Sequence, residues 1–210
     1  MIKIIIADDH AFLREGIKKT IQDELDMKVI GEASNANEVL EIMKDSDADI
    51  AIIDISMPGK SGLDILKDLK AMKKKFKVLI LSMHPEDRFA IRALKAGAVG
   101  YLTKESAPDE LVKAIRTVLT GRKYVSKALS EKLIDLLSDD TDSLPHEHLS
   151  DREYEVFIKI SSGKKAVEIA EELSISVHTV NTYRARILEK LSMNSNVELT
   201  QYAMHNNLID

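Results

Sequence analysis

Several residues that can do phosphate chemistry stand at the ends of short apolar runs: Asp8, Asp9, Asp54, Ser82 and Lys104. Carboxylate oxygens suit Mg²⁺, which keeps several waters and shares its remaining positions with a phosphate. Once a metal offsets the repulsion, one carboxylate can act as a nucleophile and carry an acyl phosphate. A lysine ammonium can stabilise the transferred phosphoryl group. A single Asp at the end of a strand is usually a helix cap, so the prediction depends on the joint pattern.

The elements that must position these residues are strands rich in Ile, Val and Leu. The runs at 50–55 and 78–81 do not alternate with polar residues, which is typical of parallel strands buried on both faces. Ligands of such sheets bind at the carboxyl ends of the strands. We therefore expect the five residues to converge on one edge. The predicted strands are residues 3–7, 28–33, 49–55, 77–82 and 100–103.

Between the strands, apolar residues recur with helical spacing. In the first such stretch we expect one buried face, made by Phe12, Leu13, Ile17, Ile21 and Leu25. Strand–helix units in succession imply right-handed crossovers. The predicted fold class is therefore α/β, with a doubly wound, five-stranded parallel sheet of the flavodoxin-like type over residues 1–121.

The pattern changes after Gly121. Residues 122–148 are predicted to be a linker that contains an amphipathic helix at about 126–138, with Ser126 as its N-cap. The acidic, polar stretch 139–145 ends in Pro and is typical of a tether. From residue 149 to 210 only helical periodicity occurs, which predicts a small all-α domain.

Composition excludes several classes of function. The chain has no cysteine, so thiol catalysis, disulfides and thiolate metal sites are excluded. With no signal peptide and no apolar run long enough to span a membrane, we expect a cytoplasmic protein without membrane partners. A net charge of −5 argues weakly against general polyanion binding but leaves room for a local DNA-binding face.

Residues 1 to about 120 resemble the receiver domain of bacterial two-component response regulators. The matching stretches are Ile5-Ile6-Ala7-Asp8-Asp9-His10, Ile53-Asp54-Ile55-Ser56-Met57-Pro58-Gly59 with Gly62, Leu81-Ser82, and Tyr101-Leu102-Thr103-Lys104. The resemblance implies that Asp54 is the phosphoacceptor and that Lys104 pairs with the phosphoryl oxygens. It implies switch roles for Ser82 and Tyr101. Mg²⁺ would be bound by Asp9, Asp54 and the Ser56 main-chain carbonyl, with Asp8 acting largely through water. Glu105 departs from the Pro that many receivers have there.

The helical region begins with Ser150 and Glu153 in capping-box spacing. A short helix at 167–173, a turn and a longer helix at 177–191 form the helix-turn-helix arrangement, whose second helix enters the major groove. Basic side chains there can contact phosphates or guanine, and Asn can read adenine. The candidate DNA-binding residues are Lys164, Lys165, His178, Thr179, Asn181, Thr182, Arg184, Ala185, Arg186 and Lys190.

Acidic residues slightly outnumber basic ones over 150–210, so charge alone fits a helical protein-interaction module equally well. The dispersed pattern Leu149-Ser150-Asp151-Arg152-Glu153 … Glu168-Ile169-Ala170 … Ile187-Leu188-Glu189-Lys190-Leu191 favours DNA. It is similar to the LuxR-type DNA-binding domain, and the whole chain resembles a response regulator of the NarL type. The family usually has basic residues where this chain has Val167 and Asn181, and His in place of Tyr183, which lowers the expected DNA affinity or alters the site preference.

The resemblance implies a non-enzymatic regulator, apart from autophosphorylation by small phosphodonors and self-dephosphorylation. A sensor histidine kinase would phosphorylate Asp54, and a homodimer would bind double-stranded DNA, with RNA polymerase as a further partner. Two alternatives remain open at this point. One is a phosphorylation-dependent adaptor that does not bind DNA. The other is a Mg²⁺-dependent phosphohydrolase, disfavoured because such enzymes commonly have a second Asp where this chain has Ser56.

Overall fold

The computed structural model describes residues 1–57, 60–71, 76–84, 86–127, 129–131 and 144–209. The chain divides into two compact units, Met1–Asp139 and Asp140–Asp210. Among the described residues, no helix has the length and apolarity needed to cross a membrane.

The first unit contains one five-stranded sheet in the order β2-β1-β3-β4-β5, and every pair in it is parallel. From β1 the chain moves first to β2 at one edge and then back past β1 to β3, so the order of the strands reverses between β1 and β3. In sheets of this kind ligands bind at the carboxyl ends of the strands beside that point. The predicted doubly wound α/β fold is confirmed. The strands are β1 (Ile2–Ala7), β2 (Met27–Ala33), β3 (Ile50–Asp54), β4 (Lys77–Ser82) and β5 (Gly100–Thr103).

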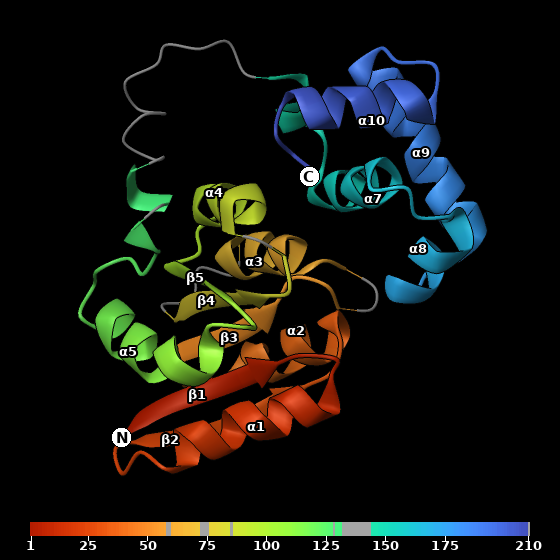
Figure 1. Cartoon of the computed structure of the whole chain (residues 1–210). Coiled ribbons are helices and arrows are strands. Elements are labelled where there is room, and N and C mark those ends of the chain that lie inside the picture. The colour runs from red at the N-terminus through yellow and green to blue at the C-terminus, as the bar shows by residue number, and fades with distance from the viewer. Residues whose placement is uncertain (58–59, 72–75, 85, 128, 132–143, 210) are drawn as a thin grey trace. The chain divides into compact units, whose positions relative to one another are not determined.

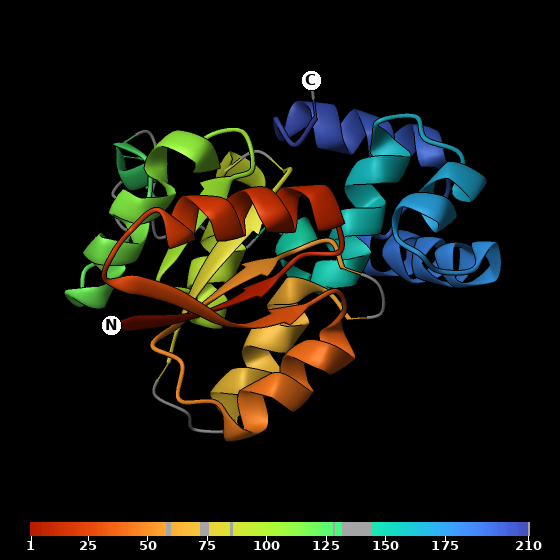
Figure 2. The same ribbon diagram turned by 90° about the horizontal axis from the view of Figure 1, so that it is seen from below.

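Helices cover both faces of this sheet (Figures 1 and 2). Helices α1 and α5 contact each other on one face, while α2 contacts α3 and α3 contacts α4 on the other. Right-handed crossovers between parallel strands produce this arrangement. The helices are α1 (Ala11–Gln22), α2 (Ala36–Asp45), α3 (Gly62–Ala71), α4 (Glu86–Ala96) and α5 (Ala107–Leu119).

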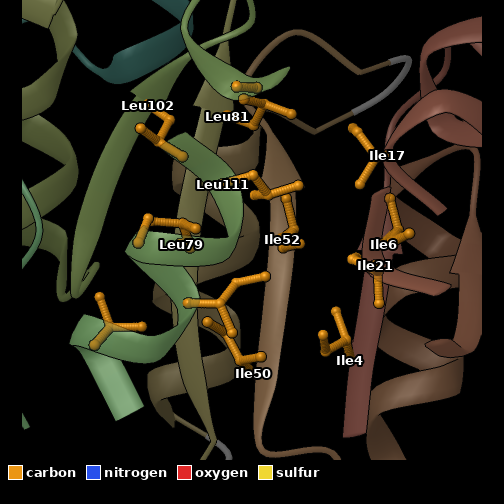
Figure 3. Close-up of a cluster of buried hydrophobic side chains, with 14 of the residues drawn as sticks. Ile4, Ile6, Ile17, Ile21, Ile50, Ile52, Leu79, Leu81, Leu102 and Leu111 are labelled. Carbon is orange, nitrogen blue, oxygen red and sulfur yellow. The ribbon is translucent and has the colours of Figure 1, made fainter. Parts of the chain in front are cut away.

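Alternation along the strands determines which face each side chain joins. Successive residues of a strand point to opposite faces. A single buried cluster between the sheet, α1 and α5 takes every second residue of the strands (Figure 3). Asp54, two residues beyond Ile52, continues this alternation at the end of β3. The labelled members are Ile4, Ile6, Ile17, Ile21, Ile50, Ile52, Leu79, Leu81, Leu102 and Leu111.

The face predicted for the first helix is wrong at both ends. Ile17 and Ile21 are buried, but Phe12 is 95% exposed and Leu25 is 99% exposed. At about 100° per residue, Phe12 lies roughly 140° around the helix from Ile17, on the solvent side. Leu25 follows the last helical residue, Gln22, and therefore no longer shares the helical face.

The chain returns to the sheet directly after α5. The amide of Tyr124 donates to the Val99 carbonyl at 3.0 Å, and the amide of Tyr101 donates to the Tyr124 carbonyl at 3.1 Å. Tyr124 thereby pairs with the open edge of β5. Gly100 permits this close approach, because a Cβ there would lie 2.7 Å from the Tyr124 carbonyl oxygen.

The predicted linker 122–148 is structured at both of its ends. Ser126 caps the following helix, since its hydroxyl accepts from the Leu129 amide at 3.1 Å, and Leu129 is buried. The remainder of the predicted helix, 132–138, lies outside the described residues. At the other end η1 (Pro145–His148) belongs to the second unit, where His146 Nδ1 lies 3.0 Å from the Tyr202 hydroxyl.

The second unit is helical, as predicted: α7 (Asp151–Ser161), α8 (Ala166–Glu172), α9 (Val177–Leu191) and α10 (Asn196–His205). Serine side chains begin three of these helices by accepting a backbone amide at the third helical position. Val180, Ile187 and Leu191 of α9 are buried, as the periodicity predicts. Between α8 and α9, Ser174 takes a left-handed conformation with φ 51°, which allows a tight turn.

The capping box of α7 is joined to α9 by an ion pair. The Glu153 carboxylate accepts from the Ser150 amide at 2.7 Å and from Lys190 Nζ at 2.6 Å. Burial alone would raise the pKa of this carboxyl, but the contacts with Lys190 and Ser150 outweigh it and hold the pKa below its usual value. The charged form is therefore favoured in the folded domain.

We expect Glu153→Gln to lower the stability of this domain at neutral pH by about 1 kcal/mol. Gln can still cap α7, but it loses the ion pair with Lys190. Because the folded pKa is depressed, this contribution is present above the unfolded pKa and is lost as pH falls through the folded value. Hydrogen exchange of the α7 and α9 amides in the full chain at pH 7 and near pH 4 measures it. Glu189→Gln, an exposed acid of α9, is the control; a difference that persists undiminished at low pH would contradict the assignment.

Candidate metal centre and nucleic-acid interface

An ammonium group connects two buried carboxylates at the carboxyl edge of the sheet. Lys104 Nζ lies 2.8 Å from Asp54 Oδ2 and 2.8 Å from Asp8 Oδ2. Asp8 follows β1, Asp54 ends β3 and Lys104 follows β5, and all three are buried. The sequence predicted that these three residues meet, and the structure brings them together.

A cluster of possible metal ligands surrounds this contact. Ligand atoms of Asp8, Asp9, His10 and Asp54 all lie within 4.8 Å of one another. The Asp9 Oδ1 atom is buried and accepts no hydrogen bond of good geometry, although His10 Nδ1 is 2.8 Å away. A buried carboxylate oxygen without a donor is suited to a cation. This oxygen-rich set with open positions fits Mg²⁺.

The environment affects the two central charges differently. Burial raises the pKa of the Asp54 carboxyl above its usual range, and the nearby Lys104 ammonium opposes this without cancelling it. Burial works to lower the pKa of Lys104, but the carboxylates of Asp54 and Asp8 outweigh it, so the pKa of Lys104 is raised. Lys104 therefore keeps its charge. A divalent cation beside Asp54 would favour the ionised carboxylate, which is the nucleophilic form.

Gly62 supports the backbone of Asp54. Its amide donates to the Ile55 carbonyl at 2.8 Å, so the start of α3 is hydrogen-bonded to the residue that follows β3. A Cβ at Gly62 would lie 2.2 Å from the Asp54 carbonyl oxygen and 2.9 Å from Ile55 Cα. The start of α3 therefore packs directly on the peptide that presents the Asp54 carboxylate.

Ser82 and Tyr101 are both buried and are connected through His84, which the sequence analysis did not single out. The Ser82 hydroxyl accepts from the His84 amide at 3.1 Å, and the Tyr101 hydroxyl donates to the His84 carbonyl at 2.9 Å. The His84 ring also lies 3.1 Å from the Ser56 hydroxyl through Nε2 and stacks on Phe89. The sequence feature that could have identified His84 is its position, two residues after the serine that ends β4.

The candidate DNA-binding residues lie on α9 and just before α8. The side chains of His178, Asn181, Ala185 and Arg186 are exposed on α9, and Lys164 and Lys165 precede α8. Val167, where the family usually has a basic residue, is 54% exposed on α8.

Several of these polar groups have partners within the domain. Lys190 pairs with Glu153 and Lys164 with Glu172, while Arg184 Nε donates to Asn196 at 2.6 Å. Within the described part of the chain, no acidic partner is found for Arg186. Arg186 is therefore the α9 cation most available to a DNA phosphate.

Arg152 secures the end of α8 at the turn. Its guanidinium donates to the Leu173 carbonyl at 3.1 Å and to Glu155 at 2.6 Å. Leu173 is the C-cap residue of α8, so one of the open carbonyls at that helix end receives a charged donor. This contact joins α7 to the C-terminal end of α8.

Comparisons with known proteins agree with both units. Residues 4–116 match the response regulator receiver domain model, and residues 147–203 match the model of bacterial regulatory proteins of the luxR family. The chain is 34% identical to the response regulator UvrY of Escherichia coli over 99% of this chain and 96% of that protein. It is 35% identical to the response regulator GacA of Pseudomonas aeruginosa over 100% of this chain and 99% of that protein.

Among solved structures, RcsB from Salmonella enterica serovar Typhimurium is 26% identical and has a TM-score of 0.61, covering 96% of this chain and 97% of that one. That structure is of RcsB bound to the promoter P1flhDC in the presence of the phosphomimetic BeF₃⁻. These matches extend over both units, so the relatives share the receiver and the helix-turn-helix domain with this chain. The chain is a two-component response regulator of the NarL/LuxR family, with a receiver domain and a LuxR-type DNA-binding domain.

Proposed function

We propose that Asp54 accepts a phosphoryl group from a sensor histidine kinase and that this modification switches DNA binding by the C-terminal domain. The observation that carries the proposal is the placement of Asp54 between Lys104, at 2.8 Å, and the acids Asp8 and Asp9. One buried carboxylate therefore lies next to both a cation and a set of oxygen ligands. That arrangement can offset the negative charge of a transferring phosphoryl group.

Mg²⁺, held by Asp8, Asp9, Asp54 and the Ser56 main-chain carbonyl, would neutralise charge on the phosphoryl oxygens when bound. The Asp54 carboxylate attacks phosphorus in line, an O–P bond forms, and the N–P bond to the kinase histidine breaks. The electron pair leaves with the imidazole nitrogen. Lys104 exchanges its contact with Asp54 Oδ2 for one with a phosphoryl oxygen, so its charge stays paired throughout.

The phosphoryl group then acts on the residues around His84. It adds roughly −1.5 to −2 charges and three acceptor oxygens to Asp54. The Ser82 hydroxyl, at present an acceptor for the His84 amide, can turn and donate to one of those oxygens. A change there also affects the hydrogen bond between the Tyr101 hydroxyl and the His84 carbonyl. Phosphorylation would thereby shift the population between two conformations of the region around Ser82, His84 and Tyr101.

On the DNA side, α9 enters the major groove and a homodimer binds two half-sites about one helical turn apart. The similarity of this chain to RcsB, whose structure was solved bound to a promoter, supports the proposal that it binds DNA. The lack of basic residues at Val167 and Asn181 leaves phosphate contacts to Lys164, Lys165, Arg184 and Arg186. RNA polymerase is a further proposed partner. The phosphoryl group of the kinase and chromosomal DNA are both available in the cytoplasm. We therefore expect the protein to act there.

Capture of genomic DNA fragments by the full chain, with and without a small phosphodonor and Mg²⁺, tests the proposal. We expect phosphodonor to enrich a restricted set of fragments by about tenfold or more, equivalent to about 1.4 kcal/mol of coupling. Phosphorylation without any DNA enrichment would instead indicate an adaptor. Turnover of a generic phosphate monoester would indicate a phosphohydrolase.

A further inference from the structure

Arg14 on α1 contacts the loop that carries the two acids after β1. Its Nη1 donates to the Asp8 main-chain carbonyl at 2.7 Å, and its Nε lies 3.3 Å from Glu32 Oε2. One guanidinium therefore joins the loop after β1 to the end of β2. The side chain is mostly covered, with 18% of its surface exposed.

Other contacts of the loop involve the Asp8 side chain and the main chain: the His10 amide donates to Asp8 Oδ1 at 2.8 Å, and Lys104 Nζ lies 2.8 Å from Asp8 Oδ2. The Asp8 amide donates to the Ala33 carbonyl at 3.1 Å, so the Asp8–Asp9 segment is fixed from one side by β2. His10, the N-cap residue of α1, makes no side-chain capping bond, and the first turn of α1 contains no acid. The guanidinium supplies a charged donor to the main-chain carbonyl of Asp8, in the loop that precedes α1.

Glu32 offsets the charge of this arginine. Its other oxygen, Oε1, accepts from Lys18 Nζ at 2.6 Å. The pKa of Glu32 is lowered, first by the hydrogen bond from Lys18 and also by Arg14, although burial opposes this. The carboxylate therefore stays ionised and holds the guanidinium to β2. An arginine free to move this close to three carboxylates would compete with a divalent cation for them.

We propose that Arg14, held by Glu32, is a positioning residue that fixes the Asp8–Asp9 backbone so that both carboxylates are preorganised for Mg²⁺. The inference rests on the proposed function only in the identity of the metal. Partners of this kind, which orient the metal ligands without touching the metal, commonly change metal affinity by 10–100-fold.

Charge and positioning predict opposite results for one substitution. Arg14→Gln removes a positive charge near the acids, and electrostatics alone would strengthen Mg²⁺ binding. If Arg14 acts by positioning, the same change weakens binding. Lys19→Gln is the matched control, because it removes an equal charge from an exposed position of the same helix and touches neither Asp8 nor Glu32.

Calorimetric titration of the full chain with Mg²⁺ measures the effect. We expect the Kd to rise about tenfold in Arg14→Gln and to stay unchanged or fall slightly in Lys19→Gln. Arg14→Lys keeps the charge but cannot reach both Asp8 and Glu32 with a planar group, so its Kd should also rise. It serves as the test if Arg14→Gln does not fold. Binding as tight as wild type in both Arg14 variants, or an equal loss in Lys19→Gln, overturns the proposal.

Phosphorylation by a small phosphodonor gives a second measurement. The Mg²⁺ concentration at half-maximal rate should rise about tenfold in Arg14→Gln, while the maximal rate at saturating Mg²⁺ stays near wild type. A reduced maximal rate with unchanged Mg²⁺ dependence would assign Arg14 a merely structural role and overturn the proposal. If the wild type accepts no phosphoryl group, the proposed function fails, but the Mg²⁺ titration still decides the role of Arg14.

Discussion

Replacing Asp54 with Asn abolishes phosphorylation, with incorporation of phosphate expected to fall by more than about 100-fold. The amide has no anionic oxygen to attack phosphorus. The substitution keeps the shape of the side chain, and its carbonyl oxygen can still accept from the Ser56 amide, which lies 3.3 Å from Asp54 Oδ1. Lys104 keeps its contact with Asp8 at 2.8 Å. The loss therefore reports the missing nucleophile.

Intact-mass spectrometry after incubation with phosphodonor and Mg²⁺ measures this prediction. Hydroxylamine should release the phosphate from the wild type, because it cleaves an acyl phosphate and leaves a serine phosphate intact. Asp68→Asn, which removes an acid of α3 whose side chain is 41% exposed, is the control and should be phosphorylated normally. Phosphate retained on Asp54→Asn in amounts near wild type would show that another residue is the acceptor.

The sheet and the meeting of Asp8, Asp54 and Lys104 were predictable because they depend on local patterns. A parallel strand buried on both faces is encoded by a short run of Ile, Val and Leu, and its carboxyl end falls where the run ends. Parallel topology then brings these ends to one edge whatever the lengths of the connections. The positions of the acids and the lysine follow from strand ends alone.

Other parts depend on contacts between distant segments, which a periodicity does not encode. The guanidinium of Arg14 reaches Glu32, 18 residues away, and nothing in the local pattern distinguishes Arg14 from an ordinary solvated base. Tyr124 pairs with the edge of β5 although it belongs to a segment that resembles a linker. The apolar character of Phe12 was misleading, because its angle around the helix decides its burial.

Gly62→Ala should damage the same site without changing any reacting group. The new Cβ would lie 2.2 Å from the Asp54 carbonyl oxygen, so α3 or the end of β3 must move. Overpacking of this kind typically costs about 1–3 kcal/mol of stability. A displacement of about 1 Å at a reacting group can reduce a rate by about 100-fold. We therefore expect slower phosphorylation of Asp54, by about 10–100-fold, in a receiver that is less stable but folded.

Gly16→Ala separates this steric effect from a general effect of replacing glycine. Gly16 lies within α1, and a Cβ there has no atom within 4 Å. Alanine is favoured over glycine in a helix interior by about 0.5–1 kcal/mol, so this variant should be as stable as wild type or more so. Urea unfolding and the rate of phosphorylation by a small phosphodonor, measured for both variants, form the comparison. If Gly62→Ala matched Gly16→Ala in stability and in rate, the backbone of Asp54 would tolerate movement, and the close packing of α3 on β3 would have no part in presenting the carboxylate.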